Sequence, residues 1–180
     1  MVKSVLIIGA GPGLSASLAR LCSKQGMKVA LAARNIAKLE ELSKETNASL
    51  YSCDASSISD VQKLFHDTDH GIGTPDLVVY NPSARVRGPI EKLDAEATKK
   101  ALEITSFGAF LVAQESTKRM LLKGSGSIFF TGASAGVKGY ANSSVFAMGK
   151  FALRGLAQAC LLYTSPSPRD AHESRMPSSA

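Results

Sequence analysis

The sequence predicts a doubly wound α/β fold, in which helices cover both faces of a parallel sheet in three layers. Short apolar runs alternate with longer amphipathic stretches up to about residue 160. The apolar runs are continuous rather than interrupted at every second residue, as expected of strands that are buried on both faces. Strands separated by helices are joined by crossover connections, which make neighbouring strands parallel.

The first elements follow from apolar runs and their spacing. Val5–Ile8 is an apolar run followed at once by a glycine-rich turn, which favours a buried first strand. A helix is expected over Leu14–Lys24, because leucines recur there at a spacing that gathers them on one helix face. Those leucines are Leu14, Leu18 and Leu21. The next elements are a strand at Lys28–Ala32, a helix at Ile36–Lys44 with Leu39 and Leu42 inward, and a strand at Leu50–Cys53.

Capping residues mark the beginning of two later helices. Ser57 can cap the helix that contains Val61–Phe65, with Asp60 at the third helical position, as in a capping box. Asp94 should cap a long helix that runs to about Leu122. The core-facing residues of that long helix are expected to be Leu102, Phe110 and Leu111. The remaining elements are strands at Asp76–Tyr80 and Ser127–Thr131 and a last helix at Ser144–Cys160.

The composition excludes several classes of protein. The chain has 180 residues, of which 44% are apolar and 20% are charged, as in an ordinary globular domain. Its formal net charge is +6, from 21 Lys and Arg against 15 Asp and Glu. The basic residues form no run and are not interleaved with aromatic residues, so we expect no nucleic-acid partner. No apolar run approaches the roughly 20 residues that cross a bilayer, so we expect no membrane association.

The cysteines favour a reducing compartment. Cys22, Cys53 and Cys160 are an odd, scattered set, with no Cys-x-x-Cys pair and no metal-ligand spacing to a histidine. We therefore expect neither a disulfide framework nor a metal site, and we expect the protein to be cytoplasmic.

A turn rich in glycine is a candidate phosphate-binding site. Gly9, Gly11, Pro12, Gly13 and Leu14 directly follow the first expected strand and open the first expected helix. Glycines let the backbone approach a pyrophosphate, and the helix N-terminus supplies N–H donors and the positive end of its dipole. The alternative is a turn that packs the helix closely and binds nothing.

The end of the second strand indicates which dinucleotide is preferred. An NAD-binding site places a carboxylate here, to accept hydrogen bonds from the adenosine ribose. The sequence has Ala33 and Arg34 instead, and a guanidinium suits a 2′-phosphate. NADP(H) is therefore expected to be preferred over NAD(H), the alternative being that Arg34 is only an exposed residue at the start of a helix.

From Val5 to Ala159 the sequence resembles the short-chain dehydrogenase/reductase family, which has the Rossmann fold. The matching segments, in the family's order and spacing, are Gly9–Leu14, Ala33–Asn35, Cys53–Ala55, Val78–Asn81, Gly108–Phe110, Ile128–Gly136 and Phe146–Gln158. The resemblance implies that Asp54 and Ala55 face the adenine ring and that Asn81 lies beside the cofactor. From the residues alone, Asp54 is equally well explained as a turn or cap carboxylate.

The family transfers a hydride between a nicotinamide and a carbonyl or alcohol, with a Tyr as general acid, a Lys four residues later, a Ser and an Asn. At these positions the sequence has Phe146, Lys150, Ala133 followed by Ser134, and Thr105, so that only the lysine is retained. Lys150, Ser134, Phe146 and Thr105 are nevertheless the candidate catalytic residues. The chain resembles an atypical subgroup in which Phe replaces the Tyr. Tyr140 could act as a substitute acid, but a loop aromatic that covers the pocket is the favoured interpretation.

The resemblance also bears on the ends and the assembly of the chain. Residues 1–160 are expected to form one truncated dinucleotide-binding domain, lacking the family's last strands and substrate loop. Residues 161–180, with three of the seven prolines and no periodicity, are expected to be a disordered, non-native tail. The two long helices, Asp94–Leu122 and Ser144–Cys160, are expected to make a homo-oligomer.

Two functions are compatible with these observations. The first is an NADP(H)-preferring oxidoreductase with a degenerate active site and a small carbonyl or alcohol substrate. The second is a catalytically silent NADP(H)-binding module that acts as a sensor or scaffold, and a non-functional fragment is a third possibility.

Overall fold

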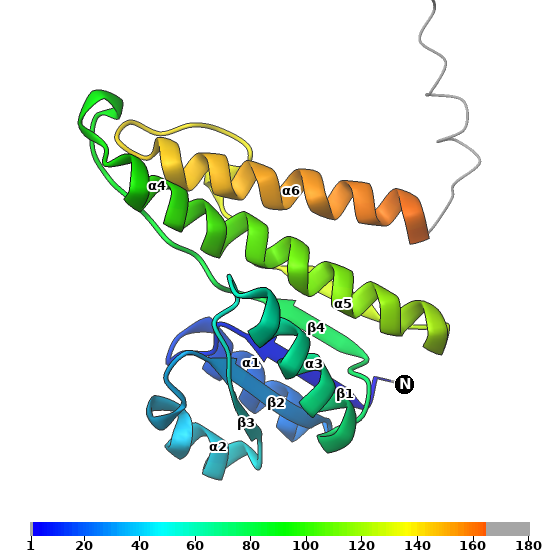
Figure 1. Ribbon diagram of the computed structural model, residues 1–180. Helices are drawn as coiled ribbons and strands as arrows, with labels where there is room; N and C mark the ends of the chain where they lie inside the picture. Colours follow the sequence, from blue (N-terminus) through cyan, green and yellow to red (C-terminus); the bar gives the residue numbers. More distant parts are fainter. Residues whose placement is uncertain (1, 165–180) are drawn as a thin grey trace, which may run out of the picture.

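Five parallel strands form the central sheet of the computed structural model, which describes residues 2–164, with side chains to residue 160 (Figure 1). The strand order is β3-β2-β1-β4-β5, and every neighbouring pair is parallel. The strands are β1 (Ser4–Ile8), β2 (Lys28–Ala33), β3 (Ser49–Ser52), β4 (Leu77–Tyr80) and β5 (Ser127–Phe130). The order reverses direction after β3, which gives the doubly wound arrangement of a Rossmann-like α/β fold and confirms the predicted fold class.

Helices cover both faces of the sheet. One face carries α1 (Leu14–Lys24), a short 3₁₀ turn η1 (Ile36–Leu39) and α2 (Glu40–Thr46). The other face carries α3 (Ile58–Gly71), α5 (Gly108–Lys123) and α6 (Ser144–Thr164). A further helix, α4 (Ala95–Leu102), extends beyond the sheet, where it lies beside the start of α6 (Figure 1).

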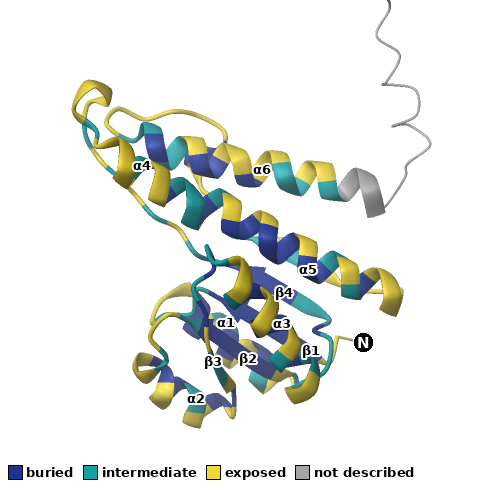
Figure 2. Ribbon diagram, viewed as in Figure 1, coloured by how far each residue is buried: buried dark blue, intermediate teal, exposed yellow. Residues whose placement is uncertain are grey.

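The core has two parts, one on each side of the sheet. Alternate residues of each buried strand enter opposite parts, so that Leu6 and Ile8 pack with α3 and α5, while Val5 and Ile7 pack with α1 and α2. Tyr80 is the largest fully buried side chain. Figure 2 shows the buried strands β1, β2 and β4 between helices whose outer faces are exposed, whereas the edge strands β3 and β5 are at most partly buried. None of the described helices is long and apolar enough to cross a membrane.

The expected helix caps are present. The Ser57 hydroxyl accepts the N–H of Asp60, and the Asp94 carboxylate accepts the N–H of Ala97 at 2.7 Å. Leu39 and Leu42 are buried, as expected. The helix expected at 36–44 consists of η1 followed by α2, and the last helix continues past residue 160 to Thr164. The rest of the expected disordered tail, residues 165–180, lies outside the described residues.

Of the three leucines expected on one face of α1, only Leu18 packs against the core, and it is partly buried. Leu14 and Leu21 are 62% and 56% exposed, whereas the small residues Ala16, Ala19 and Cys22 are buried. The helix leaves a tight turn at the end of β1 and therefore runs close to the sheet, where only small side chains fit. In α5 the prediction for Phe110 is wrong, since this side chain is 45% exposed and stacks on Phe107 instead.

The long helix expected from Asp94 to Leu122 is interrupted. A π-helical turn, η3 (Glu103–Phe107), separates α4 from α5. Within it the Tyr80 hydroxyl donates a hydrogen bond to the backbone carbonyl of Ile104. Such turns inside α-helices occur frequently at functional sites, and this one contains Thr105.

Candidate functional site

The glycine-rich turn after β1 is tightly constrained. Gly9 has φ +75°, and a Cβ at this position would lie 2.7 Å from the backbone nitrogen of Pro82, so only glycine fits. The N–H groups of Gly9 and Ala10 both donate to the carbonyl of Ala32. At Gly13, which precedes α1, no side chain caps the helix, so its first N–H groups remain available to an anion.

Ser15 occupies the place where the family pattern closes the turn with a glycine. Its hydroxyl donates to the Gly9 carbonyl at 3.3 Å and accepts the Asn81 amide at 2.9 Å. The Asn81 side-chain amide also donates to the Gly9 carbonyl. Its backbone N–H donates to the Ile8 carbonyl and so extends the hydrogen bonding between β1 and β4 by one residue. The serine thus joins the turn to the end of β4 and keeps Asn81 in a fixed orientation.

A pocket of about 420 Å³ lies along the carboxyl ends of the strands, where open α/β sheets bind ligands. It is lined by seven of the residues predicted to bind a cofactor: Gly9, Gly11, Pro12, Arg34, Asp54, Ala55 and Asn81. The other three, Gly13, Leu14 and Lys150, are not among its lining residues. Sequence reasoning did not identify Lys38, which lines the pocket with Arg34 and lies four residues after it. This spacing at the start of a helix was a signal that could have revealed it.

Asp54 has a structural role in its own turn. Its carboxylate accepts the hydroxyl of Ser56 at 2.6 Å and the backbone N–H of Ser56 at 3.0 Å. These two hydrogen bonds, and more weakly the charges of Arg34 and Lys100, lower the pKa of the Asp54 carboxyl. Asp54 therefore remains charged in the pocket. Its geometry is compatible both with a turn carboxylate and with a residue that faces the adenine ring.

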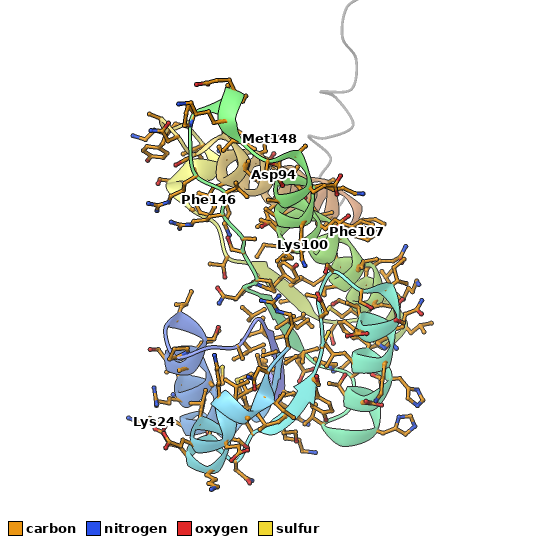
Figure 3. The ribbon with its side chains drawn as sticks, turned by 60° about the vertical axis from the view of Figure 1, so that its left-hand side comes forward. Lys24, Asp94, Lys100, Phe107, Phe146 and Met148 are labelled. Atoms are coloured by element: carbon orange, nitrogen blue, oxygen red, sulfur yellow. The ribbon has the colours of Figure 1, made fainter. Side chains whose placement is uncertain are left out.

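Phe146 and Lys150 lie one turn apart near the start of α6 (Figure 3 labels Phe146). Lys150 is 4% exposed, and its ammonium donates to the backbone carbonyl of Thr131 at 2.7 Å. The ammonium lies 5.7 Å from the centre of the Phe146 ring. Burial, and then the charge of Arg85, lower the pKa of Lys150.

Arg85 is a second residue that sequence reasoning missed. Its guanidinium lies over the Phe146 ring, 3.9 Å from the ring centre. Arg85 lies on the loop that follows β4, four residues beyond Asn81, and so at the ligand-binding edge of the sheet. Asn81 was identified because ligands bind at the carboxyl ends of parallel strands, and the same rule could have been applied to the loop that follows it.

The remaining predicted residues lie around this pair. Thr105 is fully buried, and its hydroxyl accepts the backbone N–H of Ala84 at 3.0 Å. Its methyl group packs on Gly149, where a Cβ would lie 2.8 Å away. Ser134 begins the 3₁₀ turn η4 (Ser134–Gly136) and is exposed.

Tyr140 is 44% exposed, and the Lys138 ammonium lies 5.1 Å from its ring centre. Its ring contacts this loop cation, and Tyr140 is not among the lining residues of the pocket, so the prediction that it covers the pocket stays a prediction. Within the part of the chain that the structure describes, no three His, Cys, Asp or Glu residues gather as a metal site would need.

Comparison with known proteins identifies the family. The sequence profile of the family described as short chain dehydrogenase matches residues 3–166. A 3-oxoacyl-[acyl-carrier-protein] reductase of Bos taurus is 25% identical over 161 residues, which cover 88% of this chain and 68% of that protein. The crystal structure of a short-chain dehydrogenase from Rhodopseudomonas palustris is 30% identical, with a TM-score of 0.84, over 91% of this chain and 80% of that one.

A structure of actinorhodin polyketide ketoreductase with NADPH is 25% identical, with a TM-score of 0.87, over 91% of this chain and 65% of that one. The profile match spans both the glycine-rich turn and the Phe146–Lys150 pair. On this match and the shared fold, the chain belongs to the short-chain dehydrogenase family.

Proposed function

We propose that this chain is an NADP(H)-preferring oxidoreductase that transfers a hydride to or from a small carbonyl or alcohol, with a degenerate catalytic site. The observation that carries the proposal is the pocket itself. It joins the glycine-rich turn to Arg34 and Lys38, the only two cations among its lining residues. A pyrophosphate at the turn and a 2′-phosphate beside Arg34 and Lys38 would match these donors in charge and in order.

The residues present fit a dinucleotide. Beyond Gly11 and Gly13 there is open space within 4 Å of where a Cβ would stand, so a phosphate can approach the backbone. Asp54 and Ala55 would hold the adenine end, and Asn81 would lie against the middle of the cofactor. Lys150, whose ammonium has donors beyond its bond to Thr131, would hold the nicotinamide ribose.

The chemistry supplied by the bound cofactor is a hydride at the nicotinamide ring. The chain's own contribution to proton transfer is weak, because Phe146 has no ionisable group and Ala133 has no hydroxyl. Loss of a positioned general acid typically lowers the rate by about 10²–10⁴-fold. We therefore expect slow turnover, with the proton drawn from water at the exposed edge of the site near Ser134.

The alternative is a catalytically silent NADP(H)-binding module that acts as a sensor or scaffold. Two contacts favour it. The Phe146 ring is covered by the Arg85 guanidinium, and the Thr105 hydroxyl is engaged with a backbone N–H. Neither side chain is arranged to pass a proton to a substrate.

The experiment that tests the proposal is a titration of the protein with NADPH, with NADH as the control, followed by nicotinamide fluorescence. We expect NADPH to bind and NADH to bind at least tenfold more weakly, since a 2′-phosphate gains a charge-assisted contact. Equal affinity for the two would remove the preference, and no binding of either would remove the nucleotide site altogether.

The proposal has two further parts. Cys22 and Cys53 are buried free thiols, and burial raises the pKa of Cys53 to about 12, which is compatible with a cytoplasmic location. Exposed aromatic side chains on α5 and α6, among them Phe110 and Phe151, support assembly into a homo-oligomer through these helices. Light scattering tests this part, and a monomeric mass would contradict it.

A further inference from the structure

The Arg85 guanidinium is held in place without a carboxylate. It stacks on the Phe146 ring at 3.9 Å, and this contact fixes the guanidinium plane while leaving its edge donors open. Among the described residues no Asp or Glu forms an ion pair with Arg85 or with Lys150. Arg119, by contrast, is paired with both Asp69 and Glu115.

The two chain segments that meet at Arg85 carry basic residues and no acidic ones. Two segments meet here, residues 81–90 and residues 131–160, and the Gly88 N–H donates to the carbonyl of Asn142 between them. Together these segments contain five cations, which are Arg85, Arg87, Lys138, Lys150 and Arg154, and no Asp or Glu. A cleft edge with one sign of charge attracts ligands of the opposite sign.

The loop that carries Arg85 is fixed at its preceding residue. The Ala84 N–H donates to the buried Thr105 hydroxyl in the π-helical turn η3. This bond connects the loop after β4 to the helix that lies against the start of α6, which carries Phe146. Thr105 stands where the family pattern has Asn, and Phe146 stands where it has Tyr. Both residues help to position the Arg85 guanidinium, Thr105 through the loop and Phe146 through its ring.

Two like charges lie close together in this arrangement. The charge of Arg85 acts on the buried ammonium of Lys150 and disfavours its protonated form. An anion bound to Arg85 would relieve that repulsion and satisfy the open donors of the guanidinium.

We propose that Arg85, seated on Phe146, binds a carboxylate of the substrate, so that the substrate class is a carbonyl or hydroxy compound that carries a carboxylate. This inference rests on the proposed function, because it places the substrate at the Phe146 end of the nucleotide site. A carboxylate is favoured over other anions, because its two oxygens match the fork of a guanidinium. Arg85 does not line the pocket assigned to the dinucleotide, so its ligand is distinct from the cofactor phosphates.

The test compares levulinate, a ketone with a carboxylate, with its neutral methyl ester. Dissociation constants are measured by NMR chemical-shift titration, with and without saturating NADP⁺. Levulinate is expected to bind the unmodified protein about tenfold more tightly than the ester, as a charge-assisted bidentate contact requires. Arg85→Gln should abolish this preference, and Arg85→Lys should retain part of it.

Arg154→Gln is the matched control, because Arg154 is an exposed cation further along α6. It should keep the full preference for levulinate. Arg85 is exposed and makes no side-chain hydrogen bond within the described part of the chain, so Arg85→Gln should fold normally, which circular dichroism checks.

The outcomes separate this inference from the proposed function. Equal affinity for acid and ester, or an unchanged preference in Arg85→Gln, would overturn the carboxylate subsite. A loss of NADP⁺ affinity in Arg85→Gln equal to the loss of levulinate affinity would also overturn it, by assigning Arg85 to the cofactor. A preference for levulinate in a protein that binds no NADP⁺ would support the subsite and refute the nucleotide proposal alone.

Discussion

The Thr105 hydroxyl accepts a hydrogen bond from the backbone N–H of Ala84, with 3.0 Å between oxygen and nitrogen. Thr105 is fully buried in the π-helical turn between α4 and α5, while Ala84 lies on the loop that follows β4. A single side chain therefore holds together a helix break and the loop that presents Arg85 to Phe146. The local geometry of the site depends on this bond.

Thr105→Val is expected to destabilise the protein. Valine keeps the methyl group that packs on Gly149 but replaces the hydroxyl with a second methyl, which leaves the N–H of Ala84 without its partner. Since this donor is partly buried, its loss of a partner should lower the free energy of unfolding by about 1 kcal/mol, the low end for an unsatisfied donor. Urea denaturation measures the change, and Thr105→Ser, which retains the hydroxyl, should lose less. If valine and serine are equally stable, the hydrogen bond is not what holds the loop.

Arg34→Ala is expected to change the choice of cofactor. Removal of the guanidinium should weaken NADPH binding about tenfold and leave NADH binding nearly unchanged, because only NADPH carries the 2′-phosphate. Lys24→Ala is the control, since Lys24 lies in the last turn of α1, at the opposite end from the glycine-rich turn (Figure 3). Fluorescence titration gives the dissociation constants of NADPH and NADH. An equal loss of affinity for NADH would show that Arg34 does not distinguish between the two cofactors.

Phe146→Tyr is expected to introduce a phenol with a lowered pKa. Its hydroxyl would stand near the Lys150 ammonium and the Arg85 guanidinium, and both charges favour the phenolate over the phenol. Ultraviolet difference titration should therefore place this phenol below the usual value of about 10. Met148→Tyr, on the exposed side of the same helix, should titrate normally.

The same variant separates the two proposed functions. A gain of carbonyl reduction where the unmodified protein has none, with levulinate as substrate, would favour the silent module. Reduction of levulinate by the unmodified protein would favour the slow oxidoreductase, in which case Phe146→Tyr should raise the rate. The rise should be near 10²-fold, at the low end of general-acid effects, since Ala133 and Thr105 still depart from the family pattern.

The parallel, doubly wound sheet was predictable, because the apolar runs and the glycine turn are local signals. The run that contains Leu6 and Ile8 is short, rich in β-branched residues and followed by glycine, which together favour a buried strand. The order of the strands in the sheet was not predicted from the sequence. The break in the long helix was not predictable, since it coincides with the bond from the Tyr80 hydroxyl to the Ile104 carbonyl, between residues far apart in the chain. The exposure of Leu14 and Leu21 on α1 was not predictable either, because the helix pattern does not show how closely a helix approaches a sheet.

The candidate site also has a part that the sequence predicts and a part that depends on contacts between residues far apart in the chain. The residues that line the pocket follow strand ends and could be identified from the order of elements, as with Asn81. The position of Arg85 over Phe146 joins residues 61 positions apart, 85 to 146, one on a loop and the other on a helix. No spacing rule relates them, so sequence reasoning identified the loss of the tyrosine but not the cation that covers its replacement.

Gly108→Ala is expected to disrupt the packing between α5 and the sheet. A Cβ at this position would lie 2.5 Å from the Ala55 carbonyl oxygen and from the Tyr80 hydroxyl. Overpacking of this kind lowers the free energy of unfolding by about 1–3 kcal/mol. Gly155→Ala in α6, where a Cβ meets nothing within 4 Å, should instead be neutral or stabilising. Thermal unfolding of both variants checks the contrast, which fails if they shift the midpoint alike.

Asp76 is expected to make the stability of the protein depend on pH in the acid range. The Lys123 ammonium, followed by the backbone N–H groups of Lys3 and Ser4, lowers the pKa of the Asp76 carboxyl to about 2. The folded-state pKa is therefore below the unfolded value of about 3.9. The stabilisation is fully present above the unfolded pKa and is lost as pH falls from there through about 2.

The Asp76→Asn variant isolates this contribution. Lys123 is partly exposed and water screens its charge, so the pair contributes about 1 kcal/mol at neutral pH. Urea denaturation should show Asp76→Asn to be less stable than the unmodified protein at pH 7. The difference should shrink as the pH is lowered below 4, because protonation then removes the charge from the unmodified protein as well. A difference that stays constant with pH would assign the loss to packing rather than to the carboxylate charge.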